Sequence, residues 1–401
     1  MDTTSVAATH DVDVVRIAGG GEGVAHLDDG RVVFVAGAVP GDRARIELTV
    51  DKRRFAKGRV VDVIDGGPAR IEPTCAHVAD GCGGCDWRHI APNEQLPLKA
   101  VIVRDSLERI GRLAAPNVVV GPVLSPTGGR TTVRALVENG RAGYRRRSSH
   151  DAVLVDGCDV AHPLIEELLI DGRFGSADEA TLRVGVATGD RLAIVAPSAF
   201  DVSLPDDVIV VGADQLAAGH GAFITEEVGG RSWKISAGSF FQTRPDGAGA
   251  LVDLVAAAVE ERASVDGRLV DLYSGVGLFA GTVAGGRAVT AVEANPSSVA
   301  DAQFNLADDP VTIVESKVER WTPQPASVVV ADPSRAGLGA DAVDVIAATD
   351  AETVVLISCD SGSLGRDAAL LTGAGYRLDA ATVVDLFPQT SHVEVVSVFE
   401  R

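Results

Sequence analysis

The sequence of 401 residues contains no hydrophobic run long enough to cross a membrane. A membrane-spanning helix needs about 20 consecutive apolar residues, and every apolar run here is interrupted well before that length. The first residues, Met1–Thr4, provide neither the basic stretch nor the apolar stretch of a secretory signal peptide. These absences predict a cytoplasmic protein that has no membrane partner.

Two motifs of other enzyme classes are also missing. The glycine-rich run Gly19–Gly23 is not followed by the Gly-Lys-Ser/Thr of a phosphate-binding loop, so we interpret it as a turn. A C-x3-C-x2-C triad, which a radical mechanism would require, does not occur. The sequence therefore argues against a phosphate-cradling loop and against radical chemistry.

The five cysteines do not predict disulfides, because a reducing cytoplasm keeps thiols unpaired. Cys75, Cys82 and Cys85 form a C-x6-C-x2-C cluster, and Cys158 follows much later in the chain. Four thiolates bind either zinc or an iron–sulfur cluster, and structural zinc usually shows two close C-x2-C pairs where this chain has one. On the residues alone an iron–sulfur cluster, a zinc ion and unligated thiols all stay open.

The pattern of the chain predicts a multidomain α/β protein. Short strands separated by glycine turns predict an N-terminal OB-like β-barrel over residues 1–66. A central α+β domain with the cluster of four cysteines is expected over residues 67–230, with a helix at 93–112. Strands alternate with helices over residues 231–401, which is typical of a doubly wound Rossmann-like sheet. The last two strands, near 377–385 and 393–399, are expected to form an antiparallel hairpin at its edge.

The segment Asp271–Gly277 follows an apolar strand and precedes a helix. Gly275 and Gly277 allow the backbone to turn tightly and to come close to a ligand. Glu293 ends the next strand, where a carboxylate can accept both hydroxyls of a ribose. This arrangement predicts a nucleoside cofactor. Glycine spacing alone does not exclude NAD, because Ala280 in place of the third glycine is an allowed variant.

Three reactive side chains are expected at the ends of neighbouring strands. Cys359 follows the apolar run 354–358, Asp332 follows another apolar strand, and Glu394 lies near the last strand. Because strand ends of such a sheet meet at one rim, we expect these groups to converge there. The alternative for a lone cysteine in this position is a buried core residue.

These motifs resemble those of the RNA 5-methyluridine methyltransferases, a class I S-adenosylmethionine-dependent family. The resemblance rests on Asp271–Gly277, Asp332–Leu338, Ser358-Cys359 and Asp385–Glu394, and it extends over essentially the full chain. The segments Gly21–Ala25 and Val39–Asp42, followed by a basic strand, resemble the RNA-binding TRAM domain. Gly81–Cys85 with Gln95, Leu96 and Lys99 resembles the 4Fe–4S segment of the same family.

The resemblance implies a role for each matching residue. Cys359 corresponds to the nucleophile and Glu394 to the general base. The cofactor and substrate pocket is implied for Gln242, Tyr273, Gly275, Gly277, Glu293 and Asp332. The 4Fe–4S ligands are implied to be Cys75, Cys82, Cys85 and Cys158. The chain departs from the family pattern at Ser334, where a proline is common, and at Asp360-Ser361, where Asn-Pro is common.

The implied reaction explains why these residue types are needed. Carbon 5 of uracil is a poor nucleophile, and a thiolate that adds to carbon 6 makes it nucleophilic. A base must then remove the proton from carbon 5 so that the thiolate can leave. A uridine inside a helix is out of reach, so it should be flipped out of its stack. The alternatives are a cytosine-5 methyltransferase and a non-catalytic RNA-binding protein of the same fold.

The expected partner is ribosomal or transfer RNA, and the protein is expected to be a monomer without an obligate protein partner. A net charge of −20 is unusual for an RNA binder, but net charge does not describe local patches. Basic residues gather in the stretch 43–59 and at Arg141 and Arg145–Arg147. Each patch is either an RNA contact or solvated surface, and we expect the acidic excess to lie away from the RNA.

Overall fold

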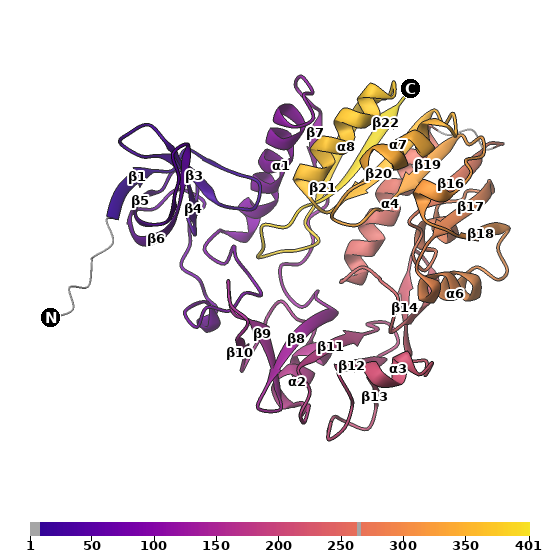
Figure 1. Cartoon of the computed structure of the whole chain (residues 1–401), viewed down its shortest axis with the longest axis horizontal. Coiled ribbons are helices and arrows are strands. Elements are labelled where there is room, and N and C mark those ends of the chain that lie inside the picture. The colour runs from indigo at the N-terminus through magenta and orange to yellow at the C-terminus, as the bar shows by residue number, and fades with distance from the viewer. Residues whose placement is uncertain (1–8, 263–265) are drawn as a thin grey trace.

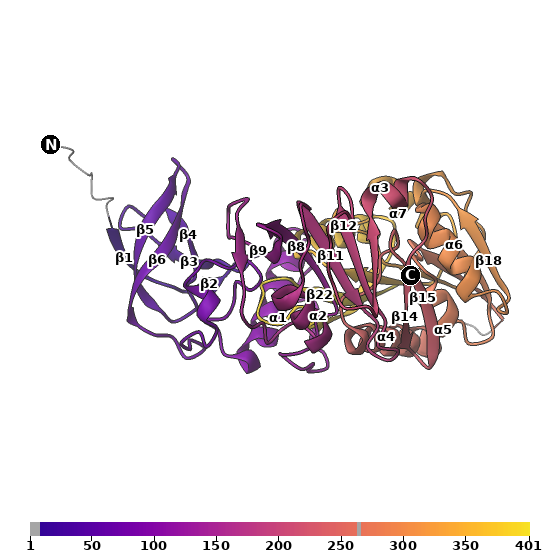
Figure 2. The same ribbon diagram turned by 90° about the horizontal axis from the view of Figure 1, so that it is seen from below.

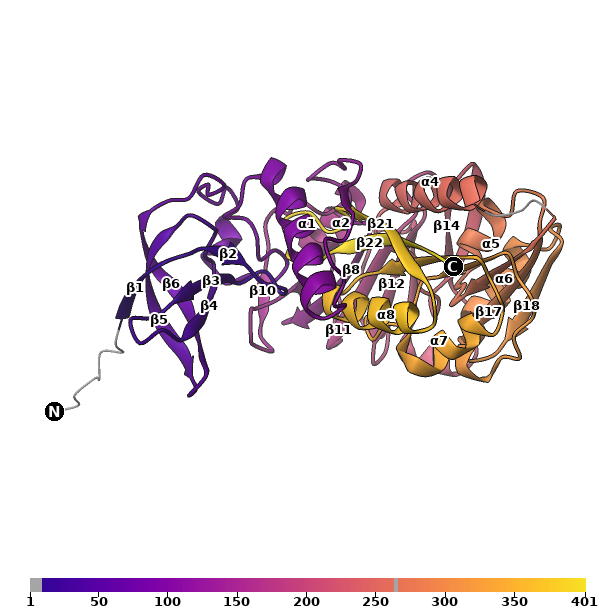
Figure 3. The same cartoon turned by 90° about the horizontal axis from the view of Figure 1, so that it is seen from above.

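The computed structural model describes residues 9–262 and 266–401. The chain forms an N-terminal curled sheet, a central sheet and a large C-terminal sheet covered by helices (Figure 1). Seen from below and from above, the molecule is elongated, with the N-terminal sheet at one end and α6 and β18 at the other (Figures 2 and 3). No helix among the described residues has the length and apolar character needed to cross a membrane.

The N-terminal part is a six-stranded sheet of order β1-β5-β6-β4-β3-β2. Its strands alternate buried apolar and exposed polar side chains. In β4, for example, Val33 and Val35 are fully buried, and Ala44 and Ile46 of β5 face them in the same core. The strands are β1 (Thr9–Asp13), β2 (Arg16–Ile17), β3 (Gly23–His26), β4 (Val32–Ala36), β5 (Arg43–Asp51) and β6 (Phe55–Asp65).

A buried carboxylate fixes the exit of the chain from this sheet. Asp42 accepts hydrogen bonds from the backbone N–H groups of Val39 and Gly67, at 2.7 and 2.9 Å, and from the Arg70 guanidinium. Although burial alone would raise the pKa of Asp42, these donors hold it below its usual value. The segment after β6 is thus tied back to the turn before β5.

The central part is a six-stranded sheet of order β10-β9-β8-β11-β12-β13, with α2 packed on it. All neighbours pair antiparallel except β12 and β13, which are parallel. A separate hairpin, β14–β15, leads into the C-terminal part. The elements are η1 (Ala76–Val78), β8 (Thr132–Glu138), β9 (Arg141–Arg145), β10 (Ala152–Leu154), α2 (Pro163–Asp171), β11 (Glu179–Val184), β12 (Arg191–Ala196), β13 (Val208–Gly212), α3 (Ala213–Ala217), β14 (Phe223–Val228) and β15 (Arg231–Ser236).

The C-terminal sheet has eight strands in the order β18-β17-β16-β19-β20-β22-β21-β7. The strands from β18 to β20 are parallel, and β22 runs antiparallel between β20 and β21. All six residues of β20 are buried, as expected for a strand covered on both faces. The elements are α4 (Pro245–Arg262), β16 (Arg268–Leu272), α5 (Leu278–Thr282), β17 (Ala288–Glu293), α6 (Pro296–Asn305), β18 (Val311–Glu315), η2 (Val318–Arg320), β19 (Val328–Ala331), α7 (Gly339–Ala347), β20 (Thr353–Ser358), α8 (Ser361–Gly373), β21 (Arg377–Val384) and β22 (Glu394–Glu400).

The C-terminal sheet also contains a strand from a segment that we expected to belong to the central domain. Strand β7 (Val118–Val120) pairs in parallel with β21 and forms the outer edge. Helix α1 (Pro92–Arg109) packs against α8, β7 and β21, and its buried face shares a core with β20. The expectation of a sheet built from residues 231–401 alone is therefore wrong in this respect. The hairpin β21–β22 is antiparallel but does not end the sheet, because β7 covers it.

Candidate active site

A cavity of about 1260 Å³, counting its open mouth, lies at the carboxyl ends of the parallel strands. This is the position at which open α/β sheets place ligands. Seven of the eight catalytic and cofactor residues expected from the sequence line it, namely Gln242, Tyr273, Gly275, Glu293, Asp332, Cys359 and Glu394. The eighth, Gly277, is buried and not among the lining residues.

The pairing of β20 with β22 brings the expected nucleophile and base together. Ser358, the last residue of β20, is paired with Val395 of β22. Continuing this antiparallel register by one residue places Cys359 opposite Glu394. Asp332 follows β19, the other neighbour of β20. The sulfur and both carboxyl groups thus belong to three adjacent strands.

The loop after β16 adopts a backbone that few residue types tolerate. Tyr273, Gly275 and Gly277 have positive φ angles of 60°, 55° and 94°. A Cβ atom on Gly277 would lie 2.7 Å from the Leu306 side chain, so only glycine fits there without a shift. Tyr273 is a strained exception of the kind that gathers at functional sites.

The carboxylate of Glu293 is fixed at the rim of the cavity. One of its oxygens accepts from the Gly275 N–H at 2.9 Å, and the other accepts from the N–H groups of Ala294 and Asn295 at 2.7 and 2.6 Å. Asn295 caps α6, and both Asn295 and Ser298 line the same cavity. Neither Asn295 nor Ser298 belongs to the residues that the sequence indicated for the cofactor.

Aromatic side chains stand at the mouth of the cavity. Phe240 is 64% exposed there. Phe387 packs edge-on against His392, with ring centroids 5.8 Å apart. Gln242 is buried and donates a hydrogen bond to Asp332 at 3.3 Å. Phe387 was visible as part of a sequence motif, but the sequence did not indicate that it lines the same cavity as Cys359.

The cavity holds acidic groups that are costly to ionise together. Burial, followed by the charges of Glu394 and Asp332, raises the pKa of Cys359 to about 11, and Arg335 opposes this. Burial also raises the pKa of Asp332 to about 7 and that of Glu394 well above its usual value. Such a site favours a cation.

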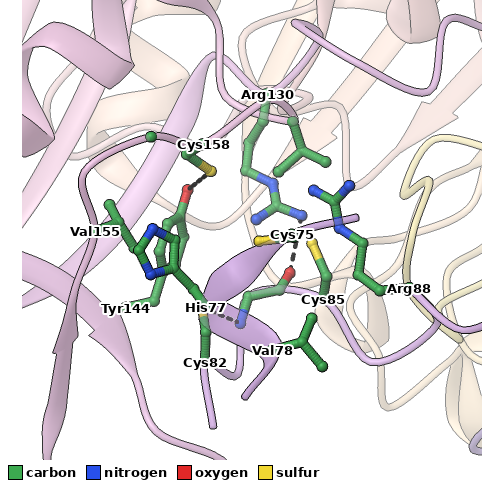
Figure 4. Close-up of a pocket in the computed structure, with 13 residues that line it drawn as sticks. Cys75, His77, Val78, Cys82, Cys85, Arg88, Arg130, Tyr144, Val155 and Cys158 are labelled. Carbon is green, nitrogen blue, oxygen red and sulfur yellow. Dashed lines mark hydrogen bonds between the residues drawn. The ribbon is translucent and has the colours of Figure 1, made fainter. Parts of the chain in front are cut away.

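The other four cysteines surround a second cavity, of about 330 Å³, which lies between the loop 75–85 and β9 (Figure 4). The Tyr144 hydroxyl lies 3.2 Å from the Cys158 sulfur, and the Gly84 N–H donates to the Cys82 sulfur at 3.5 Å. Over residues 9–262 and 266–401, however, no group of three or more His, Cys, Asp or Glu side chains is arranged to hold a metal ion.

Basic side chains also border this second cavity. Arg88 and Arg130 line it, and burial of the thiol raises the pKa of Cys85 while both guanidinium groups oppose this. Arg146 and Arg147 donate to the carbonyl oxygens of Asp80 and Cys85. Two residues of the basic patch Arg141 and Arg145–Arg147 therefore bind the loop 75–85, here called the cysteine loop.

Comparison with known proteins agrees with this architecture. Residues 4–61 match the TRAM domain family. An uncharacterized RNA methyltransferase of Streptomyces avermitilis is 33% identical over 98% of both chains, and one of Corynebacterium glutamicum is 36% identical over 97% of this chain and 96% of its own. The chain belongs to the RNA methyltransferase family.

A solved structure has the fold of this RNA methyltransferase over nearly its whole length. It is the Pyrococcus abyssi tRNA (uracil-54, C5)-methyltransferase in complex with S-adenosyl-L-homocysteine, with a TM-score of 0.70. The two chains are 23% identical, and the match covers 97% of this chain and 99% of the other. At this identity the likeness establishes the shared fold, including the TRAM domain and the Rossmann-like sheet.

The raised pKa of Cys359 predicts how the free protein reacts with iodoacetamide. Below a pKa of about 11 the thiolate fraction increases about tenfold per pH unit, so alkylation of Cys359 should keep accelerating through about pH 9.5. Arg335→Ala removes the opposing cation, raises the pKa further and should slow alkylation at each pH. Peptide mass spectrometry measures both rates. A rate that levels off near about pH 8.5 would indicate an ordinary thiol and contradict this description.

Proposed function

We propose that this protein transfers a methyl group from S-adenosylmethionine to carbon 5 of a uridine in ribosomal or transfer RNA, through a transient bond between Cys359 and carbon 6. The observation that carries the proposal is the placement of Cys359 and Glu394 at the facing ends of β20 and β22, in one cavity with a nucleoside-type loop. Membership of the RNA methyltransferase family supports RNA as the substrate.

The residues of the cavity fit S-adenosylmethionine. The group carries a positively charged sulfonium, and the cavity offers the carboxyl groups of Asp332 and Glu394, whose pKa values are raised by burial. The fixed carboxylate of Glu293 can accept from ribose hydroxyls, and Asn295 and Ser298 add polar atoms beside it. When bound, this cofactor supplies an electrophilic methyl group.

Cys359 acts as the nucleophile and Glu394 as the base in the other steps of the reaction. The Cys359 thiolate adds to carbon 6, and the electron pair of the ring double bond makes carbon 5 nucleophilic. After carbon 5 has been methylated, Glu394 takes the proton from that carbon, the double bond re-forms and the Cys359 sulfur leaves. A carboxylate with a raised pKa is a stronger base, so the burial of Glu394 suits this step.

The thiol of Cys359 must lose its proton before it can add. A cationic ligand beside Asp332 and Glu394 would offset their charges and lower the pKa of the sulfur from its value of about 11. Arg335 acts in the same direction. We therefore expect Cys359 to be activated when the cofactor is bound.

The departures from the family pattern after Cys359 leave the cavity lining unchanged. Asp360 is the N-cap of α8, and its carboxylate accepts from the Ser363 N–H at 2.7 Å. Asp and Asn are about equally good N-caps, and Ser361 stands at the first helical position. Neither residue lines the cavity of Cys359, which supports a catalytic function over a purely RNA-binding one.

Transfer of labelled methyl groups into RNA tests this proposal. The wild-type protein should form 5-methyluridine. Cys359→Ala should form none and should still bind the cofactor, because the sulfur lies outside the loop after β16 and the Glu293 carboxylate, which are proposed to hold the nucleoside. Glu394→Gln should accumulate a covalent protein–RNA adduct, because the proton on carbon 5 stays in place. Nucleoside analysis that finds 5-methylcytidine would favour the cytosine enzyme, and turnover by Cys359→Ala would refute the proposed nucleophile.

We further propose that Cys75, Cys82, Cys85 and Cys158 hold a 4Fe–4S cluster. A cluster needs thiolates placed around several metal atoms, and these four thiols line one cavity. The cations Arg88 and Arg130, which line the same cavity, would offset the thiolate charge. Because methyl transfer needs no electron, the proposed role of such a cluster is to join distant segments of the chain.

Metal analysis of anaerobically prepared protein tests the cluster. The wild-type protein should contain about four iron atoms per chain and absorb broadly in the visible range. Cys85→Ser should lose most of the iron, since one of the ligands is gone, whereas Cys359→Ser is the matched control and should keep it. Zinc in place of iron, or iron retained equally by both variants, would contradict the assignment.

A further inference from the structure

The segment 385–392, here called the catalytic loop, carries Phe387 into the active-site cavity and ends two residues before Glu394. It is anchored from outside the sheet by Lys99, a fully buried residue of α1. The Lys99 ammonium donates to the Asp385 carboxylate at 2.6 Å and to the Phe387 carbonyl oxygen at 2.9 Å. It also faces the ring of Trp87, at 5.8 Å from its centroid.

The Phe387 carbonyl oxygen accepts several hydrogen bonds that hold this loop together. Besides Lys99, it accepts from the hydroxyl of Thr390 at 2.7 Å and from the Thr390 N–H at 3.2 Å. The Thr390 hydroxyl in turn accepts from the His392 N–H, and the His392 ring packs against Phe387. These contacts connect Lys99 with the chain as far as His392, two residues before β22 begins.

Gln95 lies one helical turn before Lys99 on α1 and forms hydrogen bonds to Gln389, in the middle of the catalytic loop. Its side-chain oxygen accepts from the Gln389 N–H at 2.7 Å, and its nitrogen donates to the Gln389 side chain at 3.2 Å and to the Ile90 carbonyl at 2.9 Å. Gln389 has a positive φ of 65°, which costs free energy for a non-glycine residue and persists only where neighbours enforce it.

The two residues that follow the cysteine loop also bind the catalytic loop. The Trp87 N–H donates to the Gln389 carbonyl at 2.9 Å, and Asp86 accepts from the Ser391 N–H at 3.0 Å. These two residues directly follow Cys85. The Trp87 indole also donates to the Gly21 carbonyl in the TRAM domain, at 3.3 Å.

We infer that Lys99 is a positioning residue, which acts through the Phe387 carbonyl and Asp385 to hold the catalytic loop where Phe387 and Glu394 meet the bound nucleotide. A buried ammonium is expensive, and apolar replacements of buried ion pairs are often neutral or stabilising, so stability alone does not explain it. Both hydrogen-bonded partners of Lys99 lie in the catalytic loop. The inference rests on the proposed function and adds a residue outside the cavity to it.

Substitution of Lys99 should slow the step that needs Glu394 more than it weakens RNA binding. For Lys99→Met we expect kcat to fall roughly 10- to 100-fold, as for a displacement of about 1 Å, while KM for RNA does not rise. Because proton removal from carbon 5 slows, the covalent adduct with unmodified RNA should accumulate above its wild-type level. Steady-state kinetics and denaturing gels measure both quantities on the full-length protein.

A double variant separates positioning from stability. Lys99→Met with Asp385→Leu replaces the ion pair by apolar side chains and should recover most of the thermal stability, but it cannot recover the hydrogen bond to Phe387. We expect Tm to return towards the wild-type value while kcat stays low and the adduct persists. Recovery of kcat together with Tm, or a Lys99→Met protein with wild-type kcat, would overturn the inference.

Arg262→Met is a matched control for loss of an ion pair. Arg262 binds Asp379 of β21 at 2.8 Å and Glu400 of β22 at 2.9 Å, at the opposite end of the same hairpin. This variant should lose stability without accumulating adduct. Wild-type protein that forms no adduct even with 5-fluorouridine RNA would instead refute the proposed function, so the two failures are distinguishable.

Discussion

The antiparallel pairing of β20 with β22 is the constraint on which the rest of the site depends. It inserts a late strand between β20 and β21, with Ser358 opposite Val395, and so places a thiol and a carboxyl group at one point of the rim. A slip of one residue would turn alternate side chains to the other face of the sheet. Such a slip would also move Glu394 out of line with Cys359, so the register decides whether the thiol and the carboxyl group share the cavity.

Because the thiol and the carboxyl groups lie close together, their ionisation is unfavourable when no cofactor is bound. Burial raises the cost of ionising Cys359, Asp332 and Glu394, and the charge of Asp332 adds to that cost for the other two groups. The proposed chemistry depends on that cost. A thiolate that needs a bound cation in addition to Arg335 forms when the cofactor is present, and a carboxylate with a raised pKa is a better base. The TRAM domain, the cysteine loop and α1 contribute by holding the loop that carries Phe387, at the contacts of Trp87 and Lys99.

Much of the arrangement could be predicted from patterns in the chain, and the failures have physical reasons. Strand β16, the turn at Gly275 and Gly277, and α6 with its cap at Asn295 carry local signals in apolar runs, glycines and capping residues. Strand β7 carries none, since three valines do not reveal which sheet they join. Its membership depends on the packing of α1 against α8, a contact between segments far apart in sequence.

The same distinction applies to the site. Motifs indicated Cys359, Glu394 and Asp332, because the reaction requires those residue types at strand ends. The inward orientation of Phe387 and the anchoring by Lys99 arise from hydrogen bonds across about 290 residues of chain, which no local pattern encodes. The expected roles of the lining residues stay predictions that the structure makes geometrically possible.

The central claim is that the sulfur of Cys359 bonds to carbon 6 of a uridine, and peptide mapping of a trapped complex tests it most directly. In RNA that carries 5-fluorouridine the fluorine cannot be removed as a proton, so the adduct should persist after methyl transfer. The account predicts that mass spectrometry finds a methylated fluorouridine nucleotide on the peptide containing Cys359. A nucleotide attached to a different residue, or methylation of ordinary uridine with no adduct to fluorouridine, would contradict it.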